Sequence, residues 1–343
     1  RTPGIQPRLS KMYADLGGDQ TFLTGKTVLV TGATSGIGAG LVGELLKLGD
    51  SKPAKIVLLA RSKTKVEATA AQITAAGVEA SYYLADLSSP KEVVRAAKQI
   101  VAGEKKLSVA VLNAGIWDTS EERKVQADGL EVHYATNYLQ MVLLVETLTP
   151  LLAKNKPSRF AVTGSFTGYS ISKGELNFEY LSGAAQPPTN PHGGGAFPYS
   201  QSKLSQHVWV KAAAPTLPEG VTLNVACPGF VVSDIDIVKS FKKKLGFLFP
   251  VVKFVMGGRT TAEGCQTLLH IAASTKMDGI NGQFIDWGFK SATVVKRLPV
   301  DPKFYPGSDP KFFGPAVIAP TPADDALVKK LYDETAVIAK KFK

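Results

Sequence analysis

The stretch "KTVLVTGATSGIG", residues 26–38, joins an apolar segment to a turn that is rich in glycine. The segment 26–31 is short and β-branched, which predicts a buried strand. Gly32, Gly36 and Gly38 follow at a G-x-x-x-G-x-G spacing and lead into a helical apolar pattern. Such a turn allows the backbone to approach a pyrophosphate, which the helix N-terminus can bind. The predicted dinucleotide-binding residues of this turn are Gly32, Thr34, Ser35, Gly36, Ile37 and Gly38. A tight turn without a ligand is the alternative.

Strand and helix patterns alternate along the rest of the chain. Further strands are predicted at 55–60, 79–84, 107–112, 158–164, 221–227 and 282–286. Helical patterns fall at 63–76, 89–102, 126–154, around Tyr199 and at 259–273. This alternation predicts an α/β fold with a parallel seven-stranded sheet, doubly wound in the Rossmann manner with helices on both faces.

The chain is predicted to form one domain with two extensions. Residues 1–25 are polar and rich in Gly and Pro, and are expected to form an N-terminal arm. The Rossmann domain spans 26–290. Residues 291–343 form a Pro-rich C-terminal extension that ends in a helix at about 322–341. The apolar run 245–256 is interrupted by a proline and a lysine and is too short to cross a bilayer, so no transmembrane helix is expected.

Composition excludes several classes of function. The two cysteines, Cys227 and Cys265, form no disulfide framework, and no Cys/His spacing resembles a metal site. The net charge of +11 is compatible with nucleic acid, an anionic membrane or an anionic cofactor. No nucleic-acid-binding module is recognisable, so no nucleic-acid partner is predicted.

The residues after the second predicted strand indicate which dinucleotide is bound. NAD sites place an acidic residue here to bind the ribose hydroxyls. This chain has Arg61 followed by Ser62, and a guanidinium suits a 2′-phosphate through paired hydrogen bonds. The predicted cofactor is therefore NADP(H); the alternative is that Arg61 is a solvated loop residue.

Polar and small residues also follow the third and fourth predicted strands. Asp86 and Leu87 end the third strand and are expected beside the adenine. Asn113, Ala114 and Gly115 end the fourth and would let the backbone pass close to the cofactor. The carboxyl ends of the strands are the binding edge of this architecture, so all five residues are predicted to line one crevice.

The segment "FPYSQSKLSQ", residues 197–206, places Tyr199 and Lys203 one helical turn apart. Taken alone, this spacing is more often a solvated surface pair than a catalytic one. A free phenol has a pKa of about 10 and is a poor base at neutral pH. A nearby ammonium would favour the phenolate, so Lys203 is predicted to lower the pKa of Tyr199 and make it a general acid/base.

With these motifs in order, the chain resembles the short-chain dehydrogenase/reductase family. The resemblance is carried by "TGATSGIG", "ADLSS", "LNAG", Asn137 in "HYATNYLQ", Ser165 in "AVTGSFTG", "YSQSK" and "CPGFVVSD". It covers about residues 25–290 and is strongest to the retinol-dehydrogenase-like branch, with the protochlorophyllide reductases as further relatives. The chain departs from the family at Leu112 and Gly164, where the family often has Asn and Ser.

The resemblance implies a role for each matching residue. Tyr199 is the expected general acid/base, and Lys203 is expected to hold the nicotinamide ribose. Ser165 would bind the substrate oxygen, and Asn137 would hold a water that relays protons to Lys203. The expected nicotinamide contacts after the sixth strand are Pro228, Gly229 and Ser233.

The segment after Ser233 is expected to form a substrate lid, 233–258. Residues 238–259 are apolar and aromatic, with five lysines and one arginine and no acid. Such a segment could lie on an anionic membrane surface, or it could pack on the body with solvated lysines; the two interpretations stay open.

The functional hypothesis is an NADP(H)-dependent oxidoreductase that interconverts a carbonyl and an alcohol on a bulky apolar substrate: retinoid, steroid, isoprenoid or pigment-like. The alternative is an accessory subunit with the same fold in a larger assembly, which could be membrane-bound. The expected partner is a small lipophilic molecule, while a homodimer and docking to a larger complex both stay open. The basic charge and the absence of Met at position 1 are compatible with a processed chloroplast or mitochondrial protein or a membrane-peripheral one.

Overall fold

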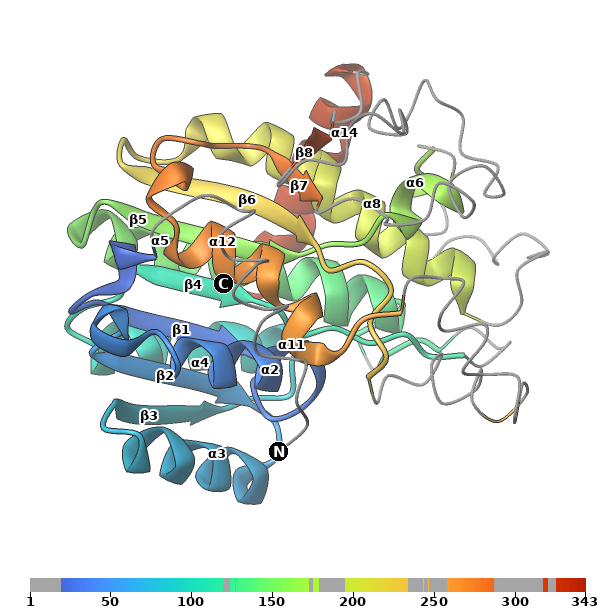
Figure 1. The fold of residues 1–343 in the computed structure, drawn as a ribbon. Helices are drawn as coiled ribbons and strands as arrows, with labels where there is room; N and C mark the ends of the chain where they lie inside the picture. The colour runs from blue at the N-terminus through green and yellow to red at the C-terminus, as the bar shows by residue number, and fades with distance from the viewer. Residues whose placement is uncertain are drawn as a thin grey trace.

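A twisted, mostly parallel sheet forms the centre of the molecule (Figure 1). The computed structural model describes residues 20–119, 124–126, 128–172, 175–178, 195–233, 243, 246, 258–286, 317–319 and 325–343. In this part of the chain the sheet has eight strands, in the order β3-β2-β1-β4-β5-β6-β7-β8. They are β1 (Thr27–Thr31), β2 (Lys55–Ala60), β3 (Glu79–Leu84), β4 (Val109–Leu112), β5 (Ser158–Thr163), β6 (Val221–Cys227), β7 (Phe284–Asp286) and β8 (Val317–Ala319).

Strands β1 to β7 pair in parallel, which confirms the predicted doubly wound sheet. Strand β8 pairs antiparallel with β7 and was not predicted. The strand order reverses direction between β1 and β4. Ligands of open α/β sheets bind at such a switch point, outside the carboxyl ends of the strands.

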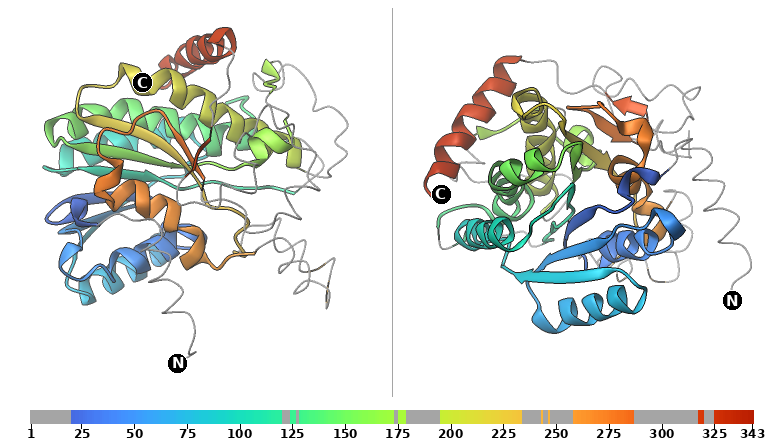
Figure 2. Two further views of the ribbon diagram at one scale, coloured as in Figure 1. Left: turned by 45° about the horizontal axis from the view of Figure 1, so that its top comes forward. Right: turned by 90° about the vertical axis from the view of Figure 1, so that its left-hand side faces the viewer.

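Helices cover both faces of the sheet (Figure 2). One face packs against α2, α3 and α12, and the other against α4, α5 and α8. Their bounds are α2 (Gly36–Leu45), α3 (Lys63–Ala75), α12 (Gln266–Ala273), α4 (Pro90–Gly103), α5 (Gln140–Lys154) and α8 (Ala196–Ala213). The shorter turns are η1 (Thr21–Leu23), η2 (Gly49–Ser51), η3 (Tyr134–Leu139), α6 (Thr167–Ser170), η4 (Ala214–Thr216), α11 (Thr261–Gly264) and η6 (Thr275–Met277). Alternate residues of β1 enter opposite cores, Leu29 on one side and Val28 and Val30 on the other, as a strand buried on both faces requires.

The last described helix, α14 (Asp325–Lys340), packs on the outside of α8. The rings of Trp209 and Tyr332 stack across this contact with their centroids 6.1 Å apart. The hydroxyls of Tyr138 and Thr335 form a buried hydrogen bond of 2.7 Å. The C-terminal helix therefore supports α8, which carries Tyr199 and Lys203.

The structure corrects one predicted segment and leaves most of another outside the residues that it describes. The helix predicted over 126–154 was wrong at its start, because helical residues begin at Val132. Before it, Val125 and Glu131 form an antiparallel bridge around Gly129, whose φ is +83°. The predicted lid, 233–258, lies outside the described residues apart from a few positions, so the membrane hypothesis stays a prediction. Among the helices that the structure describes, none is both long and apolar enough to span a bilayer.

Candidate active site

The glycine turn after β1 brings helix α2 into close contact with the strand end. Gly32 and Gly36 have φ of +65° and +55°, a region that L side chains rarely adopt. A Cβ added at Gly38 would lie 2.2 Å from the carbonyl oxygen of Gly32 and 2.6 Å from Asn113 Nδ2. Helix α2 can therefore lie this close to the turn only because residue 38 has no side chain. The turn also leaves the N-terminus of the helix open to a ligand.

A crevice of about 470 Å³ opens above this turn, along the carboxyl ends of the strands. Most residues predicted from the sequence line it: Gly32, Thr34, Ser35, Gly36, Ile37, Arg61, Ser62, Asp86, Leu87, Asn113, Ala114, Gly115, Tyr199, Lys203, Pro228 and Ser233. Four predicted residues are not among those that line the crevice: Gly38, Asn137, Ser165 and Gly229. The crevice thus runs from the glycine turn to Tyr199.

Positive charge gathers at the end of the crevice beyond β2. The Arg61 side chain is 80% exposed, and its Nη1 lies 4.0 Å from Asp86 Oδ2. Ser62 caps helix α3, because its hydroxyl accepts from the Lys65 amide at 3.5 Å. Lys65 also lines the crevice, and sequence analysis missed it. Its position three residues after the capping serine is the signal that could have identified it.

Asp86 is tied into its own turn. Its Oδ1 accepts from the Ser88 amide at 2.9 Å and from the Ser88 hydroxyl at 2.8 Å. Its amide donates to Glu92 Oε2 at 2.8 Å. The carboxylate lines the crevice, as predicted for a residue beside adenine, but one of its oxygens is already engaged.

Asn113 joins the ends of three strands. The amides of Asn113 and Ala114 both donate to Thr31 Oγ1 at 3.0 Å. The Asn113 Nδ2 donates to the Thr31 carbonyl at 3.2 Å, and its Oδ1 accepts from Thr163 Oγ1 at 3.1 Å. The amide side chain therefore joins β1, β4 and β5 and fixes the segment that passes along the crevice.

Four side chains predicted to be catalytic converge at the other end. Tyr199 and Lys203 lie on α8, Ser165 follows β5, and Asn137 lies in η3, a π-helical turn. All four are buried, with Asn137 and Lys203 only 0% and 3% exposed. Local π-helical geometry often marks functional positions.

The Ser165 hydroxyl lies near enough to the Tyr199 hydroxyl to lower the pKa of the phenol, against the larger effect of burial. The Ser165 oxygen also accepts from the amide and the hydroxyl of Thr167, at 3.2 and 2.9 Å. A serine oxygen has two lone pairs and one proton, so these two bonds leave the Ser165 proton to be donated. Tyr199 and Ser165 are therefore placed as a pair of hydroxyls that can bind the same substrate oxygen.

Lys203 and Asn137 lie behind the segment 113–116. The Lys203 Nζ donates to the Thr163 carbonyl at 2.6 Å. Asn137 binds both backbone groups of Ile116, at 2.8 and 3.0 Å, and donates to Ser202 Oγ at 2.9 Å. Asn137 thus clamps the crevice wall against α8, while the water relay implied by the resemblance stays a prediction.

Burial changes the acid–base properties of this group. It raises the pKa of Tyr199, an effect that the Ser165 hydrogen bond partly offsets. It also lowers the pKa of Lys203 to about 7. The predicted lowering of the Tyr199 pKa by Lys203 was therefore wrong in direction for this structure. The physical reason is that an amine with a pKa near 7 carries only part of its charge at neutral pH, while desolvation disfavours the phenolate.

The buried amine should make folding stability depend on pH. An unfolded lysine has a pKa of about 10.4, so between pH 7 and pH 10 the unfolded chain holds a proton that folded Lys203 lacks. The free energy of unfolding then rises with pH, by up to about 1.4 kcal/mol per unit. From pH 7 to pH 9 the wild type should gain about 2 kcal/mol more than Lys203→Met, measured by urea unfolding.

The control for this experiment is Lys63→Met, whose side chain is 69% exposed in the wild type. It should follow the wild-type pH profile. Parallel profiles for the wild type and Lys203→Met would show that the folded amine does not titrate near pH 7.

The residues after β6 close the crevice from the side. The carbonyl of Pro228 accepts from Arg259 Nη1 at 3.0 Å. Gly229 has a φ of +73°, and a Cβ there would lie 2.7 Å from the same nitrogen. Ser233 lines the crevice beside Gly36, so the structure places it near the glycine turn.

Gly164, which departs from the family pattern, makes room for another residue of α8. A Cβ at Gly164 would lie 2.4 Å from Val225 Cγ1 and 2.5 Å from His207 Nε2. His207 is fully buried, and burial lowers its pKa to about 3. A histidine here and a serine at 164 would compete for the same space, so the two positions are coupled.

Several crevice residues had no signal in the sequence. Apart from Lys65, the unpredicted residues of the wall are Leu59, Ala60, Ala85, Ile116, Trp117, Thr136, Thr163 and Gly164. Trp117 is the largest of them, and its ring stacks on Tyr199 with the centroids 4.1 Å apart and the planes inclined by 13°. Nothing in the local pattern around Trp117 predicts a contact with a residue so distant in sequence.

The sequence of the chain is similar to those of known proteins. Residues 26–177 match the family model described as short chain dehydrogenase. The chain is 30% identical to human retinol dehydrogenase 14 over 297 residues, covering 82% of this chain and 83% of that protein. It is 28% identical to mouse polyprenol dehydrogenase, covering 76% of this chain and 75% of that protein.

Solved structures share the fold. A 3-oxoacyl (acyl-carrier-protein) reductase from Agrobacterium tumefaciens C58 with NADP bound superposes with a TM-score of 0.61 at 21% identity, covering 78% of this chain and 94% of that chain. A short chain dehydrogenase from Burkholderia cenocepacia J2315 in complex with NADP gives a TM-score of 0.57 at 21% identity, covering 77% and 96%.

Proposed function

The chain belongs to the short-chain dehydrogenase/reductase family of oxidoreductases and is similar to retinol dehydrogenases, and on this basis we propose that it interconverts a carbonyl and an alcohol on a bulky apolar substrate with NADP(H). The observation that carries the proposal is the placement of Tyr199 and Lys203 at one end of the crevice, with Ser165 next to Tyr199. The glycine turn and Arg61 lie at the other end. Such a crevice suits a dinucleotide that extends from a phosphate site to a reacting group.

The residues of the crevice fit an NADP(H) molecule. The missing side chains at Gly32, Gly36 and Gly38 let the backbone and the N-terminus of α2 bind a pyrophosphate. Arg61 and Lys65, with the N-terminus of α3, form a cationic site suited to a 2′-phosphate. When bound, the nicotinamide supplies or accepts the hydride.

The chain's own residues handle the proton and the developing charge. In carbonyl reduction, Ser165 donates its proton in a hydrogen bond to the substrate oxygen, which gains negative charge as hydride reaches the carbon. Tyr199 then transfers its phenolic proton to that oxygen. A raised phenol pKa favours the protonated form that reduction requires. In alcohol oxidation the proton moves in the opposite direction.

The names of two relatives support an apolar substrate. Retinol dehydrogenase 14 and polyprenol dehydrogenase are named for long apolar alcohols. The proposal is tested by following NADPH absorbance with the full chain and a panel of retinoid, isoprenoid and steroid aldehydes and ketones. Turnover of one class supports the function. Binding of NADPH without turnover of any panel member, in either direction, would contradict it.

Replacing Arg61 should change the choice of cofactor. Loss of a hydrogen-bonded guanidinium at a phosphate should raise the KM for NADPH in Arg61→Leu by about 10-fold to 100-fold. The KM for NADH should stay within about twofold, because NADH has no 2′-phosphate. Steady-state kinetics with both cofactors measure the ratio.

The matched control for this variant is Lys63→Met, which removes a neighbouring cation that is 69% exposed and does not line the crevice. It should leave both KM values near those of the wild type. A clear preference of the wild type for NADH would overturn the cofactor assignment.

A further inference from the structure

One face of the reactive phenol is covered by an indole. The rings of Trp117 and Tyr199 lie nearly parallel, 4.1 Å apart between centroids. Trp117 and Tyr199 both line the crevice, so the stacked pair forms part of its wall. Its Nε1 is buried and has no hydrogen-bond partner among the described residues. The indole is therefore held by its stack and by the backbone that carries it, since its Nε1 binds none of the residues that the structure describes.

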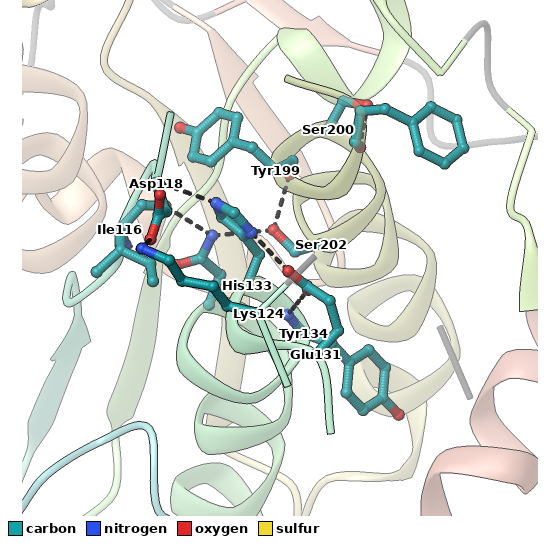
Figure 3. A network of polar contacts seen from close by, with 11 residues as sticks. Ile116, Asp118, Lys124, Glu131, His133, Tyr134, Tyr199, Ser200 and Ser202 are labelled. Atoms are coloured by element: carbon teal, nitrogen blue, oxygen red, sulfur yellow. Dashed lines mark hydrogen bonds and ion pairs between the residues drawn. The ribbon is translucent and has the colours of Figure 1, made fainter. Parts of the chain in front are cut away.

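The backbone after Trp117 is held through Asp118. The Asp118 amide donates to His133 Nε2 at 3.0 Å (Figure 3). The Asp118 carboxylate binds Lys124 Nζ at 2.6 Å. A Cβ at Gly195 would lie only 1.6 Å from the Asp118 carbonyl oxygen, so the same backbone lies against the start of α8. The segment is bound at its amide and its side chain, and its carbonyl lies against Gly195.

The hydrogen bonds of His133, which accepts from the Asp118 amide, determine the tautomer of its ring. A backbone N–H can only donate, so the Nε2 that faces Asp118 must be unprotonated. The proton of the neutral ring is then on Nδ1, which lies 2.7 Å from Glu131 Oε1 and donates to it. The other Glu131 oxygen accepts from the Tyr134 amide at 2.8 Å. Glu131 and His133 are each only 2% exposed, so a lost partner would leave a buried polar group unsatisfied.

His133 also contacts the phenol directly. Its ring lies edge-on to that of Tyr199, with 6.3 Å between centroids and 79° between planes. Tyr199 therefore has Trp117 stacked on one face and His133 in a T-shaped contact, and Figure 3 shows His133 beside Tyr199. The same imidazole that borders the phenol accepts the hydrogen bond that anchors the indole.

We infer that Glu131 and His133 are positioning residues for Tyr199, acting through the Asp118 amide and the Trp117 indole. They hold Trp117 against the phenol and so keep the Tyr199 hydroxyl directed at Ser165. Displacing a reacting group by about 1 Å can cost about 100-fold in rate, even when the mutation is remote. The inference rests on the proposed function for its kinetic consequences, while the anchoring of Trp117 does not depend on it.

The test compares two substitutions of His133. His133→Leu removes both the acceptor for Asp118 and the donor to Glu131, and should lower kcat by about tenfold with the KM for NADPH unchanged. His133→Gln retains one acceptor and one donor, and should restore kcat to within about threefold of the wild type. A purely structural role would not produce rescue together with an unchanged KM.

Substitutions of two buried carboxylates distinguish lost positioning of Tyr199 from lost stability of the fold. Glu131→Gln places an amide donor against either His133 or Tyr134, and should lower kcat as His133→Leu does. Glu104→Gln alters another buried carboxylate, which is 6% exposed and binds Ser81 at 2.7 Å and Lys55 at 2.8 Å. Glu104 does not line the crevice, so its variant should lose stability and keep kcat.

A spectroscopic measurement separates this inference from the proposed function. Acrylamide quenching of tryptophan fluorescence should increase in His133→Leu. The variant Trp117→Phe shows how much of the fluorescence and of its quenching comes from Trp117. If the wild type turns over no carbonyl compound, the proposed function fails, and increased quenching still supports the anchoring of Trp117. Unchanged quenching in His133→Leu, or a wild-type kcat in that variant, overturns the inference.

Discussion

Replacing Tyr199 by phenylalanine is expected to lower kcat by about 1,000-fold, because the variant has no proton to transfer to the substrate oxygen. Ser165 remains to stabilise the developing charge, so a residual rate should persist. The dissociation constant for NADPH should stay within about twofold of the wild type, since phenylalanine keeps the ring that stacks on Trp117. Single-turnover kinetics and NADPH fluorescence titration measure the two quantities.

Tyr138→Phe is the matched control. Tyr138 is also a buried tyrosine, but its hydroxyl binds Thr335 at 2.7 Å and does not face the crevice. Loss of that hydrogen bond should cost about 1 kcal/mol of stability and leave turnover near the wild-type rate. Near-normal turnover in Tyr199→Phe would rule out the assigned acid/base.

Replacing Gly38 by alanine is expected to weaken NADPH binding by at least about 100-fold. The added Cβ would lie 2.2 Å from the Gly32 carbonyl oxygen, a backbone atom that cannot rotate away. Helix α2 must then shift from the turn, and the amides that face a pyrophosphate shift with it. The same strain should lower the free energy of unfolding by about 1 to 3 kcal/mol. Isothermal titration with NADPH and urea unfolding provide the two measurements.

Gly43 supplies an internal control, because it lies in the same helix and a Cβ there would meet nothing within 4 Å. Gly43→Ala should stabilise the protein by about 0.5 to 1 kcal/mol through helix propensity and leave NADPH binding unchanged. If Gly38→Ala bound NADPH as tightly as Gly43→Ala, the glycine turn would not be the pyrophosphate site.

The two variants separate the two halves of the crevice. Gly38→Ala should weaken binding at an end remote from the reacting groups, whereas Tyr199→Phe should lower turnover and preserve binding. A protein that uses its crevice only to bind a nucleotide would respond to the first change alone. The pair of results therefore distinguishes an oxidoreductase from a nucleotide-binding subunit with the same fold.

Local pattern predicted the parallel strands well, because a strand buried on both faces needs a continuous apolar run. The predicted ranges for β2, β3 and β6 match the observed bounds without correction. Strand β8 was missed, because three residues in a Pro-rich stretch have no pattern of their own and pair only with a distant partner. The helix predicted over 126–154 was given too early a start, because apolar spacing does not reveal the turn at Gly129.

Residues at strand ends were predictable because parallel strands bring their carboxyl ends to one edge, so Arg61, Asp86 and Asn113 meet without further information. Side-chain contacts across the chain were not predictable. Trp117 on Tyr199 and His133 on the Asp118 amide join residues from different elements, and no periodicity encodes such pairs. The direction of the Tyr199 pKa shift failed for a related reason, because the spacing of a phenol and an amine does not tell how deeply each is buried.

Chain order and residue spacing were thus sufficient for the α/β architecture, the dinucleotide edge and the tyrosine–lysine pair. Each of these depends on the geometry of a single strand, turn or helix, which neighbouring residues specify. Desolvation, the stacked indole and the imidazole tautomer depend on which distant atoms exclude water from one another. These properties arise only when the sheet and its two helical layers have packed together.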